Sequence, residues 1–167
     1  MRIIFRLLAV FGLIAALASC GPGGKFRHYD GPPVTQIQVF KAKRVMVLFS
    51  GSKILKTYKV ALGNRPVGAK QFEGDGKTPE GAYYITHHNP NSAYHLSLGI
   101  SYPSISDAAY ATAFGMDAGG DIMIHGRAGK DKGRPKDWTA GCIAVKDKEI
   151  EEIYSMVTPG TPIIIFP

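Results

Sequence analysis

Short runs of β-branched and aromatic residues, separated by turn sequences, recur along this chain of 167 residues. Three of them, QIQVF, RVMVLFS and ILKTYKVAL, follow one another over residues 36–62 with three-residue connections between them. Connections this short join antiparallel strands, so we expect an antiparallel sheet here. Apolar runs that predict further strands return at residues 82–86, 95–103, 121–125, 142–145 and 163–166.

Two segments favour helices instead. Ser106 can cap a short helix over residues 107–114, and Gly115 can end it. Asp147 can cap a second helix, whose apolar residues are spaced to form one buried stripe. The stripe consists of Ile150, Ile153, Tyr154 and Val157. Many short strands with one or two short helices predict a mostly β domain, either a sandwich or a barrel.

The N-terminus has the pattern of a bacterial lipoprotein signal. Arg2 and Arg6 precede an apolar run over residues 7–18, which has the length of a signal-peptide core and is short for a membrane span. The run ends in LASC at Cys20, which resembles a lipobox. Gly21 follows, where an Asp is the usual signal for retention at the inner membrane. The alternative is an ordinary secretory signal in which Cys20 is incidental.

We therefore expect residues 1–19 to be a lipoprotein signal peptide, and Cys20 to be lipidated. The mature protein would be periplasmic and lipid-anchored, at the outer membrane. Residues 20–34 are rich in Gly and Pro, which is typical of a flexible tether. Residues 35–167 then form one domain.

The net charge of the chain and its predicted export together limit the kinds of partner that it can bind. Removal of residues 1–19 would leave 148 residues and lower the net charge from +7 to +5. A modest positive charge suits an anionic cell wall. Export argues against nucleic acid as a partner, and no nucleic-acid-binding motif is present.

The chain has two cysteines, Cys20 and Cys142. A lipid on Cys20 would leave Cys142 as a lone thiol in an oxidising compartment, where it is a reactive group, a partner for another chain or a buried inert residue. His125 ends one predicted strand and Cys142 begins another, with 16 residues between them. If the two strands lie side by side, the imidazole can take the thiol proton and hold an ion pair.

A glycine adjoins each of these two residues. Gly141 allows a tight turn, and the N–H groups of Gly141 and Cys142 could face an oxyanion during acyl transfer. Gly126 follows His125, and its carbonyl could hold one ring nitrogen and so fix the tautomer. We therefore predict a catalytic site made of Cys142, His125, Gly126 and Gly141.

These residues resemble those of a known family. His125-Gly126, followed by TAGC at residues 139–142, is similar to the His-Gly and Ser/Thr-x-Gly-Cys pattern of the YkuD-like L,D-transpeptidases. GKTPEG at residues 76–81 resembles the upstream TP-x-G element of that family. The segments HLSLGISYPSISD, GGDIMIHG and DWTAGCIAV resemble a YafK-like branch in particular. The resemblance covers residues 35–167.

The resemblance implies an L,D-transpeptidase-like β-sandwich in which Cys142 is the nucleophile and His125 the base. It also implies that peptidoglycan is the partner, with a stem peptide as acyl donor that is cut after the diamino acid at its third position. Two positions depart from the family pattern. Ala140 stands where many members carry His, and Ala144 where many carry Arg or Asn. In other branches the side chains at these two positions help to arrange the site or bind substrate. Their absence here bears on which acceptor is used and which reaction follows.

Several outcomes are compatible with a thioester on Cys142. A second amine would give a cross-link or attach a wall protein, which is the transpeptidase interpretation that we favour. Water would make the same site an L,D-carboxypeptidase, or an amidase that cuts links between peptidoglycan and protein. A non-catalytic wall-binding lipoprotein is a rival of another class.

Other polar residues are weaker candidates. We assign His95, Tyr102, Arg127 and Thr139 to substrate binding, with strand packing as the alternative for His95 and Tyr102. The basic residues of the loop could bind peptide carboxylates or simply be solvated. They are Arg127, Lys130, Lys132, Arg134 and Lys136. Asp137 is more typical of a turn than of a third catalytic residue. We expect no cofactor and no metal, because His87 and His88 are the only close pair of potential ligands.

Overall fold

The structure is a computed structural model, and it describes residues 24–129 and 136–167. The predicted signal peptide, Cys20 and most of the charged loop after residue 129 lie outside the described residues. The elements are β1 (Gln36–Phe40), β2 (Val45–Ser50), β3 (Lys53–Lys59), β4 (Gly81–Asn89), β5 (Ser97–Ile100), α2 (Ile105–Ala113), β6 (Met123–His125), β7 (Ile143–Ala144), α3 (Asp147–Met156) and β8 (Pro162–Phe166).

The strands form one mixed sheet in the order β3-β2-β1-β8-β4-β5-β6-β7. The first three are antiparallel, as predicted, whereas β1 pairs with β8 and β6 pairs with β7 in parallel. β4 divides the sheet, because its first half pairs with β8 and its second half with β5. A register shift between Ile85 and His88 marks the division. A bulge of this kind bends a strand, so β4 can serve both halves.

The sheet curls until its two ends meet. Ala61, after β3, exchanges both backbone hydrogen bonds with Ala144 of β7, at 2.9 and 2.8 Å. Gly63 bridges to Thr139 in the same region. The segment after the first hairpins is therefore tied directly to the strand that follows Cys142. The predicted mostly β architecture with short helices is confirmed.

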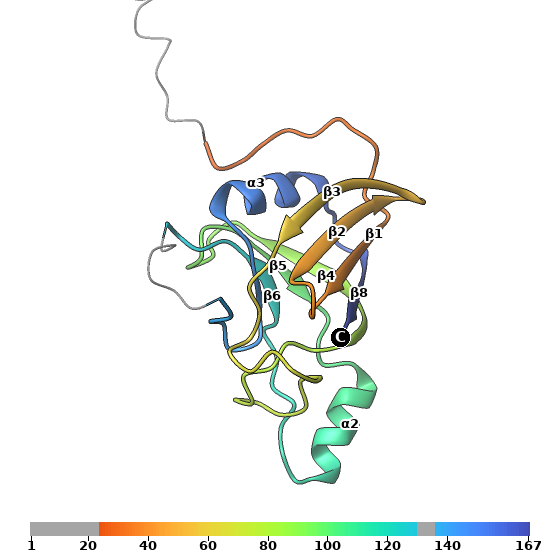
Figure 1. The fold of residues 1–167 in the computed structure, drawn as a ribbon, viewed down its shortest axis with the longest axis vertical. Coiled ribbons are helices and arrows are strands. Elements are labelled where there is room, and N and C mark those ends of the chain that lie inside the picture. Colours follow the sequence, from red (N-terminus) through yellow and green to blue (C-terminus); the bar gives the residue numbers. More distant parts are fainter. Residues whose placement is uncertain (1–23, 130–135) are drawn as a thin grey trace, which may run out of the picture.

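The two helices differ in how many of their own residues are buried. α3 lies over β5 and β6, and Ile150, Ile153 and Met156 are buried on its inner face (Figure 1). Tyr154, which was predicted in this stripe, is only partly buried and packs against the His88 ring. α2 projects away from the strands and buries only Ala111. No helix within the described ranges is long and apolar enough to span a membrane.

Both predicted helix caps are wrong by a few residues. Ser104, not Ser106, caps α2, because its hydroxyl and the Asp107 carboxylate form a reciprocal capping box. Lys146, not Asp147, is the N-cap of α3. The Asp147 side chain instead contacts the loop after His125.

Several strands are shorter than predicted. His95 and Asp121 have positive φ angles of 81° and 54°, a conformation that a β-strand does not contain. β5 and β6 therefore begin only at Ser97 and Met123.

The described part of the predicted tether is packed against the domain. Arg27 pairs with Glu151 of α3 at 2.7 Å, and Tyr29 packs against the core. Figure 1 shows this segment running past α3 before it enters β1. From residue 24 onward the chain is therefore not a free tether.

Lys41 anchors a long loop from inside the protein. It follows β1 and is 2% exposed. Its ammonium donates to the carbonyls of Gly68 at 2.6 Å and Thr78 at 2.8 Å, and to the Glu80 carboxylate at 2.8 Å. Burial lowers the pKa of Lys41, and the hydrogen bond with Glu80 opposes this effect. One side chain thus ties the end of β1 to the loop that precedes β4.

We expect Lys41→Met to lower the free energy of unfolding by about 3 kcal/mol, because Glu80 loses its cationic partner and two carbonyls lose a donor. Lys56→Met is the matched control. Lys56 pairs with Glu152 at the surface, with 44% of its side chain exposed, so its loss should cost under about 1 kcal/mol. Urea unfolding of the two variants measures the difference. Equal small losses would contradict the anchoring role of Lys41.

Candidate active site

His125 ends β6, and Cys142 directly precedes the parallel strand β7. His125 is paired with Ala144 of β7, and Cys142 comes two residues earlier, beside Met123. The backbone N–H of Met123 hydrogen-bonds the thiol. Because alternate residues of a strand point to one face, His125 and Cys142 project from the same face, offset by two residues. The structure thus places the two predicted catalytic residues on adjacent backbone segments.

The His125 ring is held in one orientation. Its Nδ1 lies 2.6 Å from the carbonyl oxygen of Gly126. A carbonyl can only accept, so Nδ1 carries the proton and Nε2 is the basic nitrogen. The residue is 3% exposed, and Tyr94 stacks on its ring at 4.5 Å while Trp138 packs edge-on at 5.6 Å. The predicted role of the Gly126 carbonyl is confirmed.

Gly126 is required by its neighbours. A Cβ on this residue would lie 2.6 Å from the Asp147 carboxylate and 2.7 Å from the Tyr94 carbonyl. Asp147 occupies this space because it accepts hydrogen bonds from three successive backbone N–H groups. They belong to Arg127 at 2.6 Å, Ala128 at 2.9 Å and Gly129 at 2.6 Å. One carboxylate therefore fixes the loop that leaves His125.

The Cys142 thiol is half-buried and donates to the carbonyl of Asp121 at 3.4 Å. Burial raises the pKa of this thiol, although the Met123 N–H acts in the opposite direction. The charge of Asp121 raises the pKa further, and Lys70 lowers it. This direction is opposite to the standing thiolate–imidazolium pair that the sequence predicted. A raised pKa favours the neutral thiol over the thiolate.

Thr139 stabilises the turn that precedes Cys142. The Thr139 hydroxyl donates to the Cys142 carbonyl at 2.7 Å and accepts from the Gly141 N–H at 3.1 Å. Gly141 has φ 145°, and a Cβ there would lie 2.7 Å from the Lys77 carbonyl. The hydroxyl closes the turn, so it does not face a substrate. The Gly141 N–H, predicted as an oxyanion donor, is already engaged.

A pocket of about 350 Å³ opens at Cys142, and we call it the Cys142 pocket. Its walls come from residues 119–122, from Ala140 and from a loop that includes Lys70 and Glu73. This volume is in the range of small-molecule sites, about 300–1,000 Å³. Cys142 is thus accessible from a cleft large enough for part of a peptide.

Asp75 organises the loop on the far wall of this pocket. Its carboxylate accepts from the N–H groups of Gln71, Phe72 and Lys77 and from the ammonium of Lys70. Burial alone would raise the pKa of Asp75, but these hydrogen bonds outweigh it and lower the pKa. The ionised carboxylate therefore holds the wall in place at neutral pH.

Three other predicted residues do not line the Cys142 pocket. His95 pairs with Glu151 of α3 at 2.9 Å. Tyr102 is buried and donates to the Ala118 carbonyl, so strand packing, the alternative, describes it better. Arg127 lines a different pocket, described below. Among the described residues, no group of three or more His, Cys, Asp or Glu side chains could hold a metal ion.

Asp137 has a structural role. Its carboxylate pairs with Arg44 at 2.8 Å and accepts from the Leu62 N–H at 3.1 Å. These contacts tie the segment before Cys142 to the hairpin region, which agrees with the interpretation of Asp137 as a turn residue.

The sequence prediction missed several residues of the site. Tyr94 and Trp138 enclose the imidazole, Lys70 borders the thiol, and Asp147 holds the loop after His125. Trp138 could have been identified from the sequence, since it is the only Trp and lies four residues before Cys142. Tyr94 and Lys70 come from segments far from the motif, which only the fold brings close, whereas Asp147, five residues after Cys142, was predicted as a helix cap.

Comparison with known proteins identifies the family of this chain. The sequence matches the L,D-transpeptidase catalytic domain model named YkuD over residues 35–165. It is 30% identical over 171 aligned positions to YafK of Escherichia coli K12, a protein named as a candidate L,D-transpeptidase. That match covers 93% of this chain and 63% of YafK, so the chain spans less than two thirds of the relative.

Solved structures share the fold of this chain. The helical cell shape determining protein Pgp2 of Campylobacter jejuni superposes with a TM-score of 0.63 at 25% identity, over 87% of this chain and 51% of Pgp2. Bd1075 of Bdellovibrio bacteriovorus gives 0.59 at 23% identity, over 84% of this chain and 50% of Bd1075. By its sequence match over almost the whole folded domain, this chain belongs to the YkuD family of L,D-transpeptidase catalytic domains, and its resemblance to YafK is confirmed.

Proposed function

We propose that this protein is a cysteine acyltransferase that acts on peptidoglycan stem peptides through a thioester on Cys142. The observation that carries this proposal is the position of a thiol at a pocket that can hold part of a peptide, on the segment beside the strand that ends in a His whose basic nitrogen is Nε2. Family membership supplies the substrate class. The same atoms serve acceptor transfer and hydrolysis, and the products distinguish these outcomes.

The reaction proceeds by two acyl transfers. Cys142 attacks the carbonyl of the donor's diamino acid, at the bond that follows this residue, while His125 Nε2 takes the thiol proton. The C–N bond then breaks, and the imidazolium gives that proton to the leaving amine. An acceptor amine attacks the thioester next, passes a proton to His125 and releases the Cys142 sulfur. The new amide is the cross-link or the attachment of a wall protein.

The protonation state of Cys142 fits general-base catalysis. A neutral thiol with a raised pKa holds little thiolate at neutral pH, so an attack needs a base at the moment when the substrate is bound. His125 is oriented for this task by Gly126 and by its two aromatic neighbours. Proton transfer would then accompany attack rather than precede it.

We further propose that the protein is anchored in the periplasm, at the outer membrane, by a lipid on Cys20. The support is the LASC sequence followed by Gly21. Because Lys25 contacts the domain through the Pro90 carbonyl and the segment to residue 24 is short, the anchor on Cys20 and residue 24 would be only four residues apart. Four residues reach at most about 14 Å, so the domain would stay close to the lipid surface.

The nucleophile is tested with purified muropeptides and mass analysis of the products. We expect Cys142→Ala to lower turnover about 1,000-fold or more, and Cys142→Ser nearly as much, because a serine hydroxyl is a far weaker acid. Both variants should keep the wild-type melting temperature, since the change is small and partly exposed. Wild-type rates in either variant would exclude Cys142. New cross-links identify a transpeptidase, and shortened peptides alone identify a hydrolase.

The pKa of the Cys142 thiol is tested by measuring the rate of its alkylation with iodoacetamide as a function of pH. Because burial raises the pKa of Cys142, the midpoint should lie above the free-thiol value of about 8.5. His125→Ala should leave this midpoint nearly unchanged while it lowers acyl transfer about 100-fold or more. A low midpoint in the wild type that rises in His125→Ala would instead show a standing ion pair.

The anchor is tested by membrane fractionation and mass spectrometry of the N-terminus. We expect a diacylglyceryl thioether on Cys20 and recovery of the protein with the outer membrane. Cys20→Ser should yield uncut or soluble periplasmic protein. Recovery of the wild type as a mature, soluble protein without a lipid would refute the anchor.

A further inference from the structure

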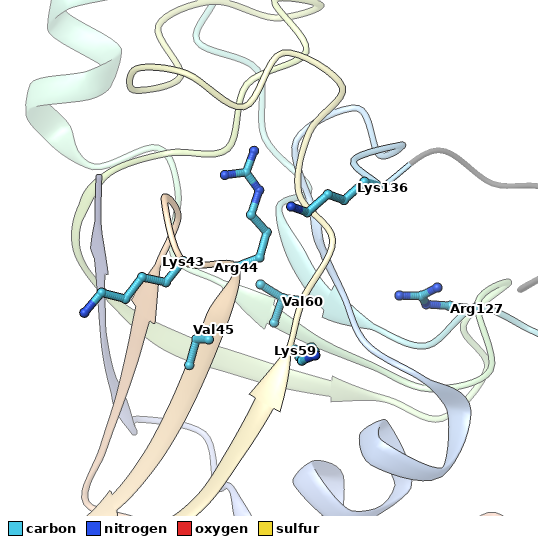
Figure 2. Close-up of a pocket in the computed structure, with 7 residues that line it drawn as sticks. All are labelled: Lys43, Arg44, Val45, Lys59, Val60, Arg127 and Lys136. Carbon is cyan, nitrogen blue, oxygen red and sulfur yellow. The ribbon is translucent and has the colours of Figure 1, made fainter.

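A second pocket, which we call the basic pocket, lies at the opposite end of β6 from the Cys142 pocket. Residues before β6 line the Cys142 pocket, whereas Arg127, after β6, lines this one. Its volume is about 370 Å³. Five of its seven lining residues are cationic, and the other two are valines. The cations are Lys43, Arg44, Lys59, Arg127 and Lys136 (Figure 2).

The described walls of the basic pocket carry more positive than negative charge. Among the described residues no acid lines it, and Asp137 pairs with Arg44. Within residues 24–129 and 136–167, no salt bridge reaches Lys43, Lys59 or Lys136. Cations gathered in one concavity repel one another and raise the local concentration of anions. The pocket therefore favours an anionic ligand.

The walls of the basic pocket are fixed in advance. The Arg44 guanidinium donates to the carbonyls of Lys41 and Ala42 as well as to Asp137, and the Arg44 carbonyl accepts from the Val60 N–H. On the other side, Asp147 holds the backbone N–H of Arg127. A ligand therefore finds both sides ordered, which lowers the entropic cost of binding.

The backbone connects this pocket to both catalytic residues. Arg127 comes two residues after His125. Lys59 comes two residues before Ala61, which hydrogen-bonds to Ala144, two residues after Cys142. Two residues span about 7 Å at most. The Arg127 wall of the pocket thus begins two residues from His125, and the Lys59 wall is linked to Cys142 through Ala61 and Ala144.

We propose that the basic pocket binds a carboxylate of the acyl acceptor, the peptide whose amine resolves the thioester. This inference rests on the function proposed above. The donor must occupy the Cys142 pocket, because its carbonyl has to reach the thiol. The acceptor amine must pass a proton to His125, and the basic pocket lies beyond that end of β6. Peptidoglycan peptides carry free carboxylates, which Lys and Arg bind through charge-assisted hydrogen bonds.

Binding is tested first, without turnover, in the Cys142→Ala protein. The probes are a stem tripeptide with a free C-terminal carboxylate and the same tripeptide with a C-terminal amide, titrated by calorimetry at low salt. We expect the acid to bind about tenfold more tightly than the amide. The double variant Lys59→Gln, Lys136→Gln should abolish this preference. Lys53→Gln, at the exposed start of the same strand and outside the pocket, should keep it.

Kinetics then assign the pocket to one substrate. With Cys142 intact, the double variant should raise the KM for the acceptor about tenfold, and saturating acceptor should restore kcat. Equal affinity for acid and amide in the parent protein would overturn the proposal, as would a loss confined to thioester formation from the donor alone. A wild type that forms no thioester refutes the proposed function instead, and the titration still decides whether the basic pocket binds the carboxylate.

Discussion

The site depends on the parallel pairing of β6 and β7, two strands of three and two residues. A pair this short cannot be stable alone, because few hydrogen bonds offset the entropy of ordering it. Its neighbours supply the stability. Ala61 exchanges two backbone hydrogen bonds with Ala144, Ser97 of β5 pairs with His125, and α3 covers the inner face. The relative position of thiol and imidazole is thus set by the closure of the whole sheet.

Buried charges hold the loops that the sheet does not reach. Asp147 fixes the chain after His125, Asp75 fixes the wall opposite Cys142, and Asp137 ties the segment before Cys142 to Arg44. Each carboxylate accepts backbone N–H groups that would otherwise lack a partner in an irregular loop. Lys41 does the same for carbonyls. Irregular backbone near the site is therefore ordered by single side chains, so each is a point at which one substitution loosens a whole loop.

The sequence predicted what local rules determine, and it failed where distant segments meet. The hairpins of residues 36–59, the apolar stripe of α3 and the placement of the His125 and Cys142 segments side by side follow from periodicity and motif spacing. Strand ends at His95 and Asp121 were missed because positive φ values at non-glycine residues have no reliable sequence signal. Thr139 and Tyr102 were assigned to substrate because a polar side chain near a motif looks the same whether it meets a ligand or the backbone.

The raised pKa of Cys142 and the two pockets bear on the order of events in the proposed reaction. Burial that favours the protonated thiol also disfavours its oxidation, since oxidants attack the thiolate. In the proposed reaction the thiol would need a base at each turnover, and His125 sits between the Cys142 pocket and the basic pocket along β6. One imidazole at this position can take a proton from the thiol on one side and from an incoming amine on the other. The orientation of the donor and acceptor peptides would then follow from the difference in charge between the Cys142 pocket and the basic pocket.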